Sequence, residues 1–370
     1  MSNPTYITPE VDEEMKGTRV FPNDVLLNIT GGSIGRCCIF PESLKTANVN
    51  QHVSIIRVNQ DVFLPEYMHY YWVSPLGSLA IDLYQTGGNR EGMSADAIKN
   101  TPIILIPLDE QRRICRVLDD ECSKIDSVLA KTHTSIEEYK KLKQAIITQA
   151  VTKGVRGNRP MKESGIEWAS LTPSEWENVN PKALFSQRKE KAAPGERQLT
   201  SSQKYGIVYQ DDYMELTGSR VVVVQKDFDI LKHVEAGDFI ISMRSFQGGL
   251  EYSTKTGSIS SAYVILVPNL NLVYPRFYRW LLKSEVYIRA LQRTSNMVRD
   301  GQAMRYSNFA QVRLYTVPLQ EQMEIADYLD EKCAVLDALI EKKEKFASEI
   351  ESYKKSLIYE YVTGKKEIEK

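Results

Sequence analysis

One stretch of about fifty residues occurs twice in this sequence. It runs from 107 to about 155 and again from 318 to about 366, and each copy begins with the pattern Pro-Leu-x-Glu-Gln. The copies align without a gap at an offset of 211 residues, so that Ile114 matches Ile325 and Cys122 matches Cys333. A repeat of this length indicates that the chain contains one structural plan twice.

Both copies carry hydrophobic side chains in two interleaved rows with a spacing of seven residues. In the first copy one of these rows reads Cys115, Cys122, Leu129, Ile136. Two such rows form the seam of a coiled coil. We therefore predict long helices over 107–155 and 317–364 that pair antiparallel. The alternative is that each helix packs only on its neighbouring domain.

The segments before each repeat share a weaker similarity. Residues 1–106 and 165–316 both contain strands, a glycine-rich turn and an aromatic helix. In the first segment this pattern predicts strands at 24–29, 52–58 and 103–106 and a helix at 65–84. The predicted fold class is α+β, in which two mixed α/β domains alternate with two long helices that pair as an antiparallel coiled coil.

The two domains are unequal in extent. The segment 165–316 has about fifty residues before the part that matches residue 1, and the first segment has no counterpart to them. We therefore expect the domain over 1–106 to be shortened at its N-terminal side. Residues 154–160 contain glycine and proline, and they are expected to break the first long helix and lead into the second domain.

The charge is divided along the chain although the formal net charge is only −1. Lysine and arginine against aspartate and glutamate give −4 for residues 1–106 and +4 for 165–316. The chain has five cysteines with no C-x-x-C spacing, no apolar run long enough to span a membrane and no signal-peptide pattern. A soluble protein of the reducing cytoplasm, without a membrane partner, is expected.

No catalytic motif is present in the sequence. It lacks a G-x-x-x-x-G-K-[ST] phosphate loop and a G-x-G-x-x-G that follows a strand and precedes a helix. The four histidines lie on different predicted elements, without a second metal ligand at helical spacing. We therefore expect no metal site, no cofactor and no enzymatic activity in this chain.

Arginine residues are concentrated between residues 276 and 313, and aromatic residues are interspersed among them. Its planar fork suits phosphate and the guanine edge, so this stretch is the candidate DNA-binding surface. Arg299 and Arg305 are the candidates for base contacts, and Arg276, Lys283 and Arg289 are those for phosphate contacts. Weaker candidates lie in or near glycine-rich loops of both domains: Arg244, Gln247, Arg36 and Arg90. The alternative is a solvated helix face with a few salt bridges.

Several motifs together resemble the DNA specificity (S) subunit of type I restriction-modification systems. They are the Pro-Leu-x-Glu-Gln start of each long helix, the pattern Gly165-Ile166-Glu167-Trp168 that opens the second domain, and the strand and glycine turn over 25–36. The resemblance covers essentially the whole chain. It implies two target-recognition domains, held apart by the helices, that each read one half of a bipartite site in double-stranded DNA.

The resemblance also implies protein partners. In that family the helices dock two methyltransferase (M) subunits, and the restriction (R) subunits assemble through them, while the S subunit has no active site. Exposed helix residues are the candidates for docking: Arg112, Arg113, Lys140, Lys141, Lys354 and Lys355. The shortened first domain leaves open a truncated S subunit that reads one half-site. A coiled-coil scaffold whose domains bind proteins is the other alternative.

Overall fold

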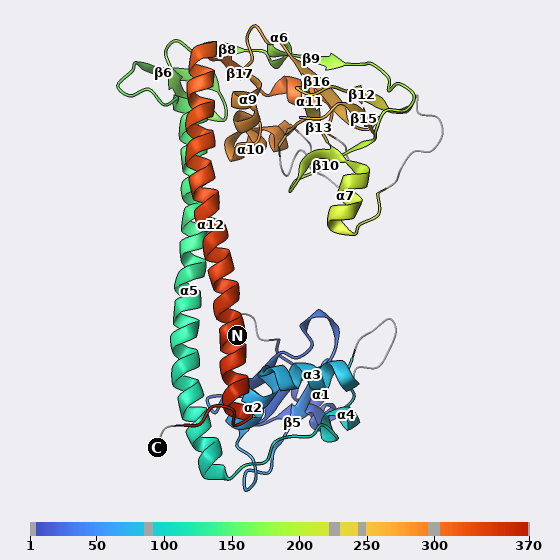
Figure 1. Cartoon of the computed structure of the whole chain (residues 1–370), viewed down its shortest axis with the longest axis vertical. Coiled ribbons are helices and arrows are strands. Elements are labelled where there is room, and N and C mark those ends of the chain that lie inside the picture. The colour runs from blue at the N-terminus through green and yellow to red at the C-terminus, as the bar shows by residue number, and fades with distance from the viewer. Residues whose placement is uncertain (1–4, 85–91, 222–229, 243–248, 295–303, 369–370) are drawn as a thin grey trace. The chain divides into compact units, whose positions relative to one another are not determined.

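The computed structural model describes residues 5–84, 92–221, 230–242, 249–294 and 304–368. It divides into two compact units, which we call unit 1 (residues 1–136 and 341–370) and unit 2 (residues 137–340). Each unit contains one mixed α/β domain and one end of both long helices (Figure 1). No helix within the described ranges is long and apolar enough to cross a membrane.

The long helices are α5 (Leu108–Lys153) and α12 (Leu319–Val362). In unit 1 the first half of α5 shares a core with the last turns of α12, where Leu118 and Ile125 lie in one cluster with Leu357 and Ile358. The predicted helices are thereby confirmed, and a core shared by the start of one helix and the end of the other requires an antiparallel pair (Figure 1).

The same seam continues in unit 2, where the roles of the helices are exchanged. Ile147 and Val151, near the end of α5, share a core with Ile325 and Leu329 near the start of α12. These are seam positions of the heptad pattern or their direct neighbours. The pairing of the helices therefore follows the hydrophobic rows that the sequence contains.

Two ion pairs cross the seam at equivalent places. Lys354 contacts Asp126 at 2.6 Å in unit 1, and Lys143 contacts Asp337 at 2.6 Å in unit 2. The offset of 211 residues relates Asp126 to Asp337 and Lys143 to Lys354, so the two ion pairs are one contact made twice. An exposed pair contributes little stability, about 0–1 kcal/mol, but the repetition shows that both units use the same helix register.

Unit 1 contains a three-stranded antiparallel sheet in the order β3-β2-β5, with a separate pair of β1 and β4. Its short helices precede and follow the sheet in the chain. The strands are β1 (Arg19–Val20), β2 (Val25–Asn28), β3 (Cys37–Ile39), β4 (Ala47–Asn48) and β5 (Val53–Ile56). The helices are α1 (Pro9–Glu14), α2 (Pro65–Val73), α3 (Pro75–Tyr84) and α4 (Ala95–Lys99), with 3₁₀ turns at Lys16–Thr18 and Gly31–Ser33.

Unit 2 contains a four-stranded antiparallel sheet in the order β14-β13-β16-β9 and several two-stranded pairs. The strands are β6 (Met161–Ile166), β7 (Ala169–Pro173), β8 (Glu177–Val179), β9 (Phe185–Arg188), β10 (Leu199–Ser202), β11 (Gly206–Tyr209), β12 (Lys232–Val234), β13 (Phe239–Ile241), β14 (Glu251–Tyr252), β15 (Gly257–Ile259), β16 (Val264–Pro268) and β17 (Leu314–Thr316). The helices are α6 (Pro181–Leu184), α7 (Gln210–Thr217), α9 (Pro275–Leu281), α10 (Glu285–Thr294) and α11 (Tyr306–Gln311).

The structure differs from the sequence prediction at the aromatic helices. The helix predicted over 65–84 is two helices, α2 and α3, and a serine lies at the break. Ser74 is buried, and its hydroxyl donates to the carbonyl of Tyr71 at 2.6 Å and accepts from the N–H of Leu76 at 3.1 Å. A serine that bonds nearby backbone groups in this way competes with the helical bonds and ends the helix.

The strand predicted over 103–106 is absent from the described residues, because that segment has no assigned secondary structure. Its counterpart in unit 2 is β17, which pairs with β8. The composition of both segments suits a strand, but among the described residues only the segment in unit 2 has a neighbouring strand to complete its backbone hydrogen bonds.

A buried glutamine joins each domain to its long helix. The side chain of Gln111 is fully buried; its oxygen accepts from the N–H of Leu64 at 2.8 Å, and its amide donates to the carbonyls of Val62 and Ile106 at 2.8 and 2.9 Å. This glutamine is the last residue of the Pro-Leu-x-Glu-Gln pattern. The motif is therefore repeated because it fixes the start of the helix to the loop before the aromatic helix.

Gln322 makes the equivalent three bonds in unit 2. It accepts from the N–H of Tyr274 at 2.6 Å and donates to the carbonyls of Leu272 and Val317 at 2.7 Å each. All three backbone groups lose their partner if the side chain is shortened.

We expect Gln322→Ala to lower the free energy of unfolding of unit 2 by about 2–4 kcal/mol, because buried backbone groups left without a partner cost about 1–3 kcal/mol each in favourable cases. Urea denaturation monitored by tryptophan fluorescence measures this, since the tryptophans at 168, 176 and 280 report on unit 2. The exposed neighbour Gln320→Ala is the control and should change stability by less than about 0.5 kcal/mol. Equal effects of the two variants would contradict the anchoring role.

Candidate nucleic-acid interface

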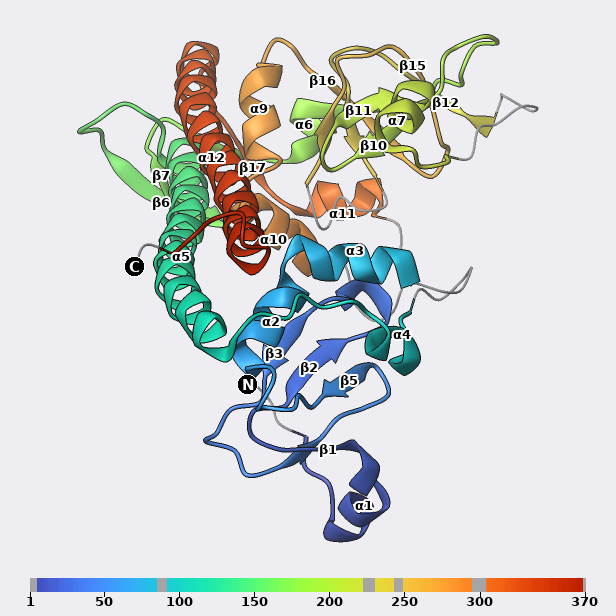
Figure 2. The same cartoon turned by 60° about the horizontal axis from the view of Figure 1, so that its bottom comes forward.

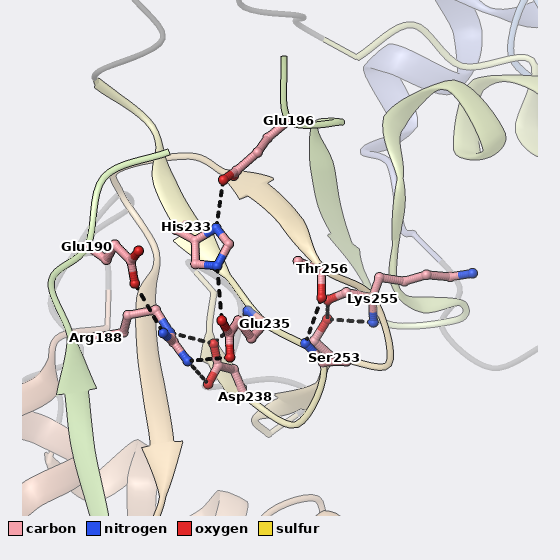
Figure 3. Close-up of polar contacts among 10 residues, drawn as sticks. Arg188, Glu190, Glu196, His233, Glu235, Asp238, Ser253, Lys255 and Thr256 are labelled. Atoms are coloured by element: carbon pink, nitrogen blue, oxygen red, sulfur yellow. Dashed lines mark hydrogen bonds and ion pairs between the residues drawn. The ribbon is translucent and has the colours of Figure 1, made fainter. Parts of the chain in front are cut away.

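The strand that leads to the glycine-rich turn begins at a buried aspartate in each unit. In unit 2 both carboxylate oxygens of Asp238 accept from Arg188, at 2.8 and 3.1 Å, and one oxygen also accepts from the N–H of Glu235 at 2.8 Å (Figure 3). Asp238 is 2% exposed. The hydrogen bonds to the carboxylate raise the pKa of Arg188, so this bidentate pair holds the turn before β13 closed.

The same aspartate in unit 1 is Asp24, but its arginine comes from a different strand. Arg57, which follows β5, donates to Asp24 at 2.7 and 2.6 Å, and the N–H of Phe21 donates to the same carboxylate at 2.8 Å. The two units therefore reach one local geometry by different residues. In each unit the pair fixes the residues just before the strand that leads to the glycine-rich segment, and the aspartate is buried.

His233 lies beside this pair in unit 2, between two carboxylates (Figure 3). Its Nδ1 is 2.8 Å from Glu196 and its Nε2 is 3.5 Å from Glu235. Within the described residues no group of three side chains is arranged to hold a metal ion. The histidine thus belongs to a hydrogen-bonded network on the strand β12.

Of the predicted phosphate contacts, Arg276 is bound within unit 2. It forms ion pairs with Asp330 at 2.5 Å and with Asp327 at 3.0 Å, both on α12. Arg279 and Trp280 donate to the same Asp330 at 2.8 and 2.7 Å. The carboxylate of Asp330 on α12 therefore binds three side chains of the aromatic helix α9 and joins the two helices.

The equivalent contact exists in unit 1. The offset of 211 residues relates Asp330 to Asp119, and Asp119 accepts from the hydroxyl of Tyr70 on α2 at 2.6 Å. Burial and this hydrogen bond raise the pKa of Tyr70. The position of Asp330 is thus a second anchor between helix and domain, beside the buried glutamine.

The other predicted cations have varied surroundings. Lys283 contacts the buried Glu251 at 2.8 Å, and Arg289 is exposed and contacts Glu285 at 3.1 Å on the same helix. Arg305 precedes α11, is exposed and makes no ion pair with a described residue. Arg36 is also exposed. Arg299, Arg244, Gln247 and Arg90 lie outside the described residues.

The predicted docking residues divide in the same way. Arg112 contacts Asp109 at 2.8 Å, Lys140 contacts Glu137 at 3.3 Å, and Lys354 is in the pair with Asp126 that crosses the seam. The remaining three are exposed and make no ion pair with a described residue: Arg113, Lys141 and Lys355.

Sequence reasoning missed a cluster formed by the hairpin β10–β11 and the connection between β14 and β15, which we call the tyrosine–lysine patch. Lys204 lies 5.0 Å from the ring centre of Tyr205, and Lys255 lies 5.4 Å from that of Tyr209. Neither lysine makes an ion pair with a described residue, in contrast to Arg197, which lies 3.6 Å from the ring of Tyr209 and is paired with two aspartates. The pair Lys204-Tyr205 was too short a signal to single out in the sequence.

Comparisons with known proteins agree with this architecture. A family model described as the type I restriction modification DNA specificity domain matches residues 3–138. A putative type I restriction enzyme MjaX specificity subunit of Methanocaldococcus jannaschii is 23% identical, covering 97% of this chain and 82% of that protein. These matches support the resemblance to type I restriction-modification specificity subunits that the sequence motifs indicated.

Two further comparisons give the same result. The type I restriction enzyme EcoBI specificity subunit of Escherichia coli is 25% identical over 191 residues, which cover 51% of this chain and 38% of that protein. A solved structure of the type I R-M system matches with a TM-score of 0.69 at 17% identity, over 93% of this chain and 82% of that one, and confirms the fold. The relatives are specificity subunits, which confirms the prediction that this chain is the non-catalytic subunit.

We expect Asp330→Ala to destabilise unit 2 by about 1–2 kcal/mol at pH 7, because three donors lose a charged acceptor that is partly buried. Burial opposes ionisation of Asp330, but the hydrogen bonds from Arg276 and Trp280 outweigh it and hold its pKa below the usual 3.8. The stabilisation is therefore present at neutral pH and is lost as pH falls through the lowered pKa. The difference between wild type and variant should accordingly shrink below about pH 4.

Urea denaturation at pH 7, 5 and 3.5 measures that difference. Asp327→Ala is the matched control, because it removes only the more exposed pair with Arg276 and should cost about 0–1 kcal/mol. A difference that stays constant across this pH range would show that Asp330 acts through packing and not through its charge.

Proposed function

We propose that this specificity subunit reads a bipartite site in double-stranded DNA, with one half read by each domain. The observation that carries the proposal is the repeated domain–helix unit, whose two copies share their helix register and both anchors. The similarity of the chain to type I specificity subunits supports it. Two similar modules on one paired-helix spacer suit two half-sites. The scaffold alternative has no comparable support.

The second domain is proposed to supply most of the DNA affinity. Residues 165–316 have a formal charge of +4, against −4 for residues 1–106. The lysines of the tyrosine–lysine patch make no ion pair with a described residue and can contact phosphates, and the adjacent rings can contact sugar or base faces. Arg305 and Arg299 remain our candidates for base contacts. Arg276 and Lys283 already neutralise carboxylates of unit 2, so we assign the phosphate contacts to the patch and to Arg289 instead.

Partner docking belongs to the same proposal. Two methyltransferase subunits would dock on the helices near the domain junctions, using Arg113, Lys141 and Lys355, and the restriction subunits would join through them. These three cations are exposed and make no ion pair with a described residue, whereas Lys354 is engaged across the seam. The protein itself needs no cofactor for this role.

We expect the double variant Lys204→Ala/Lys255→Ala to bind duplex DNA more weakly and with a shallower salt dependence. Each lost phosphate contact should reduce the magnitude of the slope of log K against log salt by about 0.9, so a change of about 2 is expected for both lysines. Fluorescence anisotropy with a labelled duplex between 50 and 300 mM salt, roughly the range over which this dependence is steep, measures it.

The control is Lys365→Ala/Lys366→Ala, because these lysines also lie over tyrosine rings, at 4.6 and 5.2 Å, but on the tail that follows α12. It should leave the slope unchanged. A slope that the patch variant does not alter would remove the patch from the interface. The absence of salt-dependent binding in the parent protein would contradict DNA reading and favour the scaffold.

We expect cells that express this chain with its methyltransferase partner to contain a methylated two-part DNA motif. Deleting one heptad from each helix at matched positions of the antiparallel register, residues 132–138 and 342–348, should shorten the gap in the motif and leave its two halves the same. The register of the two ion pairs across the seam defines these matched positions. Sequencing that detects methylated bases measures both outcomes.

The substitution Glu138→Gln, which keeps the helix length, is the control for the deletion and should leave the gap unaltered. An unchanged gap in the deletion variant, with methylation retained, would rule out the helices as the spacer. A one-part motif would show that only one domain reads DNA.

A further inference from the structure

In unit 2 one continuous segment closes two sheet edges. β8 pairs with β17, and after the short helix α6 the chain continues into β9, which pairs with β16. Trp176 and Phe185, each 1% exposed, anchor this segment in the core. We call residues 159–188 the closing segment.

The closing segment also covers the start of the long helix α12. Arg159 forms an ion pair with Glu321, and the indole N–H of Trp176 donates to the same carboxylate at 3.1 Å. Glu321 is fully buried as a result. Gly154, at the end of α5, lies so close that a Cβ there would meet Glu321 at 2.6 Å. The glutamate of the Pro-Leu-x-Glu-Gln pattern therefore binds an arginine by an ion pair and a tryptophan by a hydrogen bond, and we call this carboxylate the receptor.

Unit 1 has the counterparts of these surfaces, but the described residues do not cover them. Residues 103–105 correspond to β17, and Ile104 and Leu105 are 38% and 64% exposed, whereas Tyr315, the counterpart of Ile104, is 1% exposed. Glu110, the counterpart of Glu321, is exposed. A Cβ on Gly364, at the end of α12, would meet nothing within 4 Å.

The sheet of unit 1 is open at the matching edge as well. β5 corresponds to β16 and is the last strand of the order β3-β2-β5, with no described strand in the place of β9 (Figure 2). All four residues of β5 are partly exposed, whereas the first three of β16 are buried. Arg57 binds Asp24 in unit 1 as Arg188 of the closing segment binds Asp238 in unit 2. The carboxylate of Asp24 therefore has its partner, but the outer edge of β5 has no partner strand among the described residues.

We propose that unit 1 binds an extended segment of a separate polypeptide, with the chemistry of the closing segment. The segment would add a strand beside residues 103–105 and another beside β5, joined by a short turn, and would place an arginine and a tryptophan on Glu110. Strand addition of this kind gains affinity from backbone hydrogen bonds and specificity from side-chain pockets. An open apolar strand edge is otherwise a site for aggregation.

A second copy of this chain is a poor occupant. Its own closing segment is held in unit 2 by Trp176, Phe185 and the pair of Arg159 with Glu321, and all of these contacts would have to break before it could bind elsewhere. The proposal does not rest on DNA binding, because every contact in it lies on the helix start and on strand edges.

A synthetic peptide with the sequence of residues 159–188, labelled with fluorescein, tests the proposal on the full chain. We expect saturable binding by fluorescence anisotropy, and at least a tenfold loss of affinity for the protein variant Glu110→Gln. A peptide with both Arg159→Ala and Trp176→Ala should show a similar loss. Glu110 is exposed, so the variant should fold, and circular dichroism checks this.

Glu138→Gln is the matched control on the same helix and should bind the peptide as the parent does. Absence of saturable binding to the parent, or binding that Glu110→Gln does not weaken, would overturn the proposal. Analytical ultracentrifugation of the chain alone distinguishes the occupants. If the chain alone forms a dimer and the peptide dissociates that dimer, the occupant is a second copy of this chain and not a separate polypeptide.

Discussion

The structure depends on the buried glutamine at the start of each long helix. Gln111 and Gln322 each join three backbone groups, two from the domain loops and one from the residues just before the helix, and each is fully buried. Such a network is stable only when every group has its partner, because an unpaired buried group costs about 1–3 kcal/mol. It therefore holds the helix and the domain in one geometry. The carboxylates Asp119 and Asp330 reinforce the junction about two turns further along.

This junction explains why a specificity subunit can repeat a module with little sequence in common. The glutamine anchors lie on the helices, where the repeat is well preserved, and they bind backbone groups of the domains. The domain loops can therefore vary in side chains without loss of the junction. Variation of this kind suits the proposed function, in which the two domains read different bases while the helices keep one form.

The two units differ where a neighbouring segment completes a surface. In unit 2 the receptor Glu321 holds Arg159 and Trp176, and β17 and β16 have partner strands. In unit 1 the same receptor and the same edges are present without an occupant among the described residues. The sequence predicted that the first domain is shorter than the second. In the structure this difference lies at the strand edges of residues 103–105 and β5 and at the carboxylate of Glu110.

The repeat and the heptad rows determined the long helices, their pairing and the alternation with two mixed domains, because periodicity is a local property that neighbouring residues express directly. The resemblance of short motifs was enough to indicate the family. Charge partners were decided only by the tertiary structure, because Arg276 and Asp330 are 54 residues apart in the chain and no local pattern joins them. For the same reason the arginine-rich stretch suggested more cations available for DNA than the structure leaves, because Arg276 and Lys283 are paired with carboxylates. Lys204 and Lys255 were not recognised as candidates from the sequence. The strand predicted at 103–106 depended on a partner strand that the segment itself does not contain, since a sheet edge is completed only by residues distant in the chain.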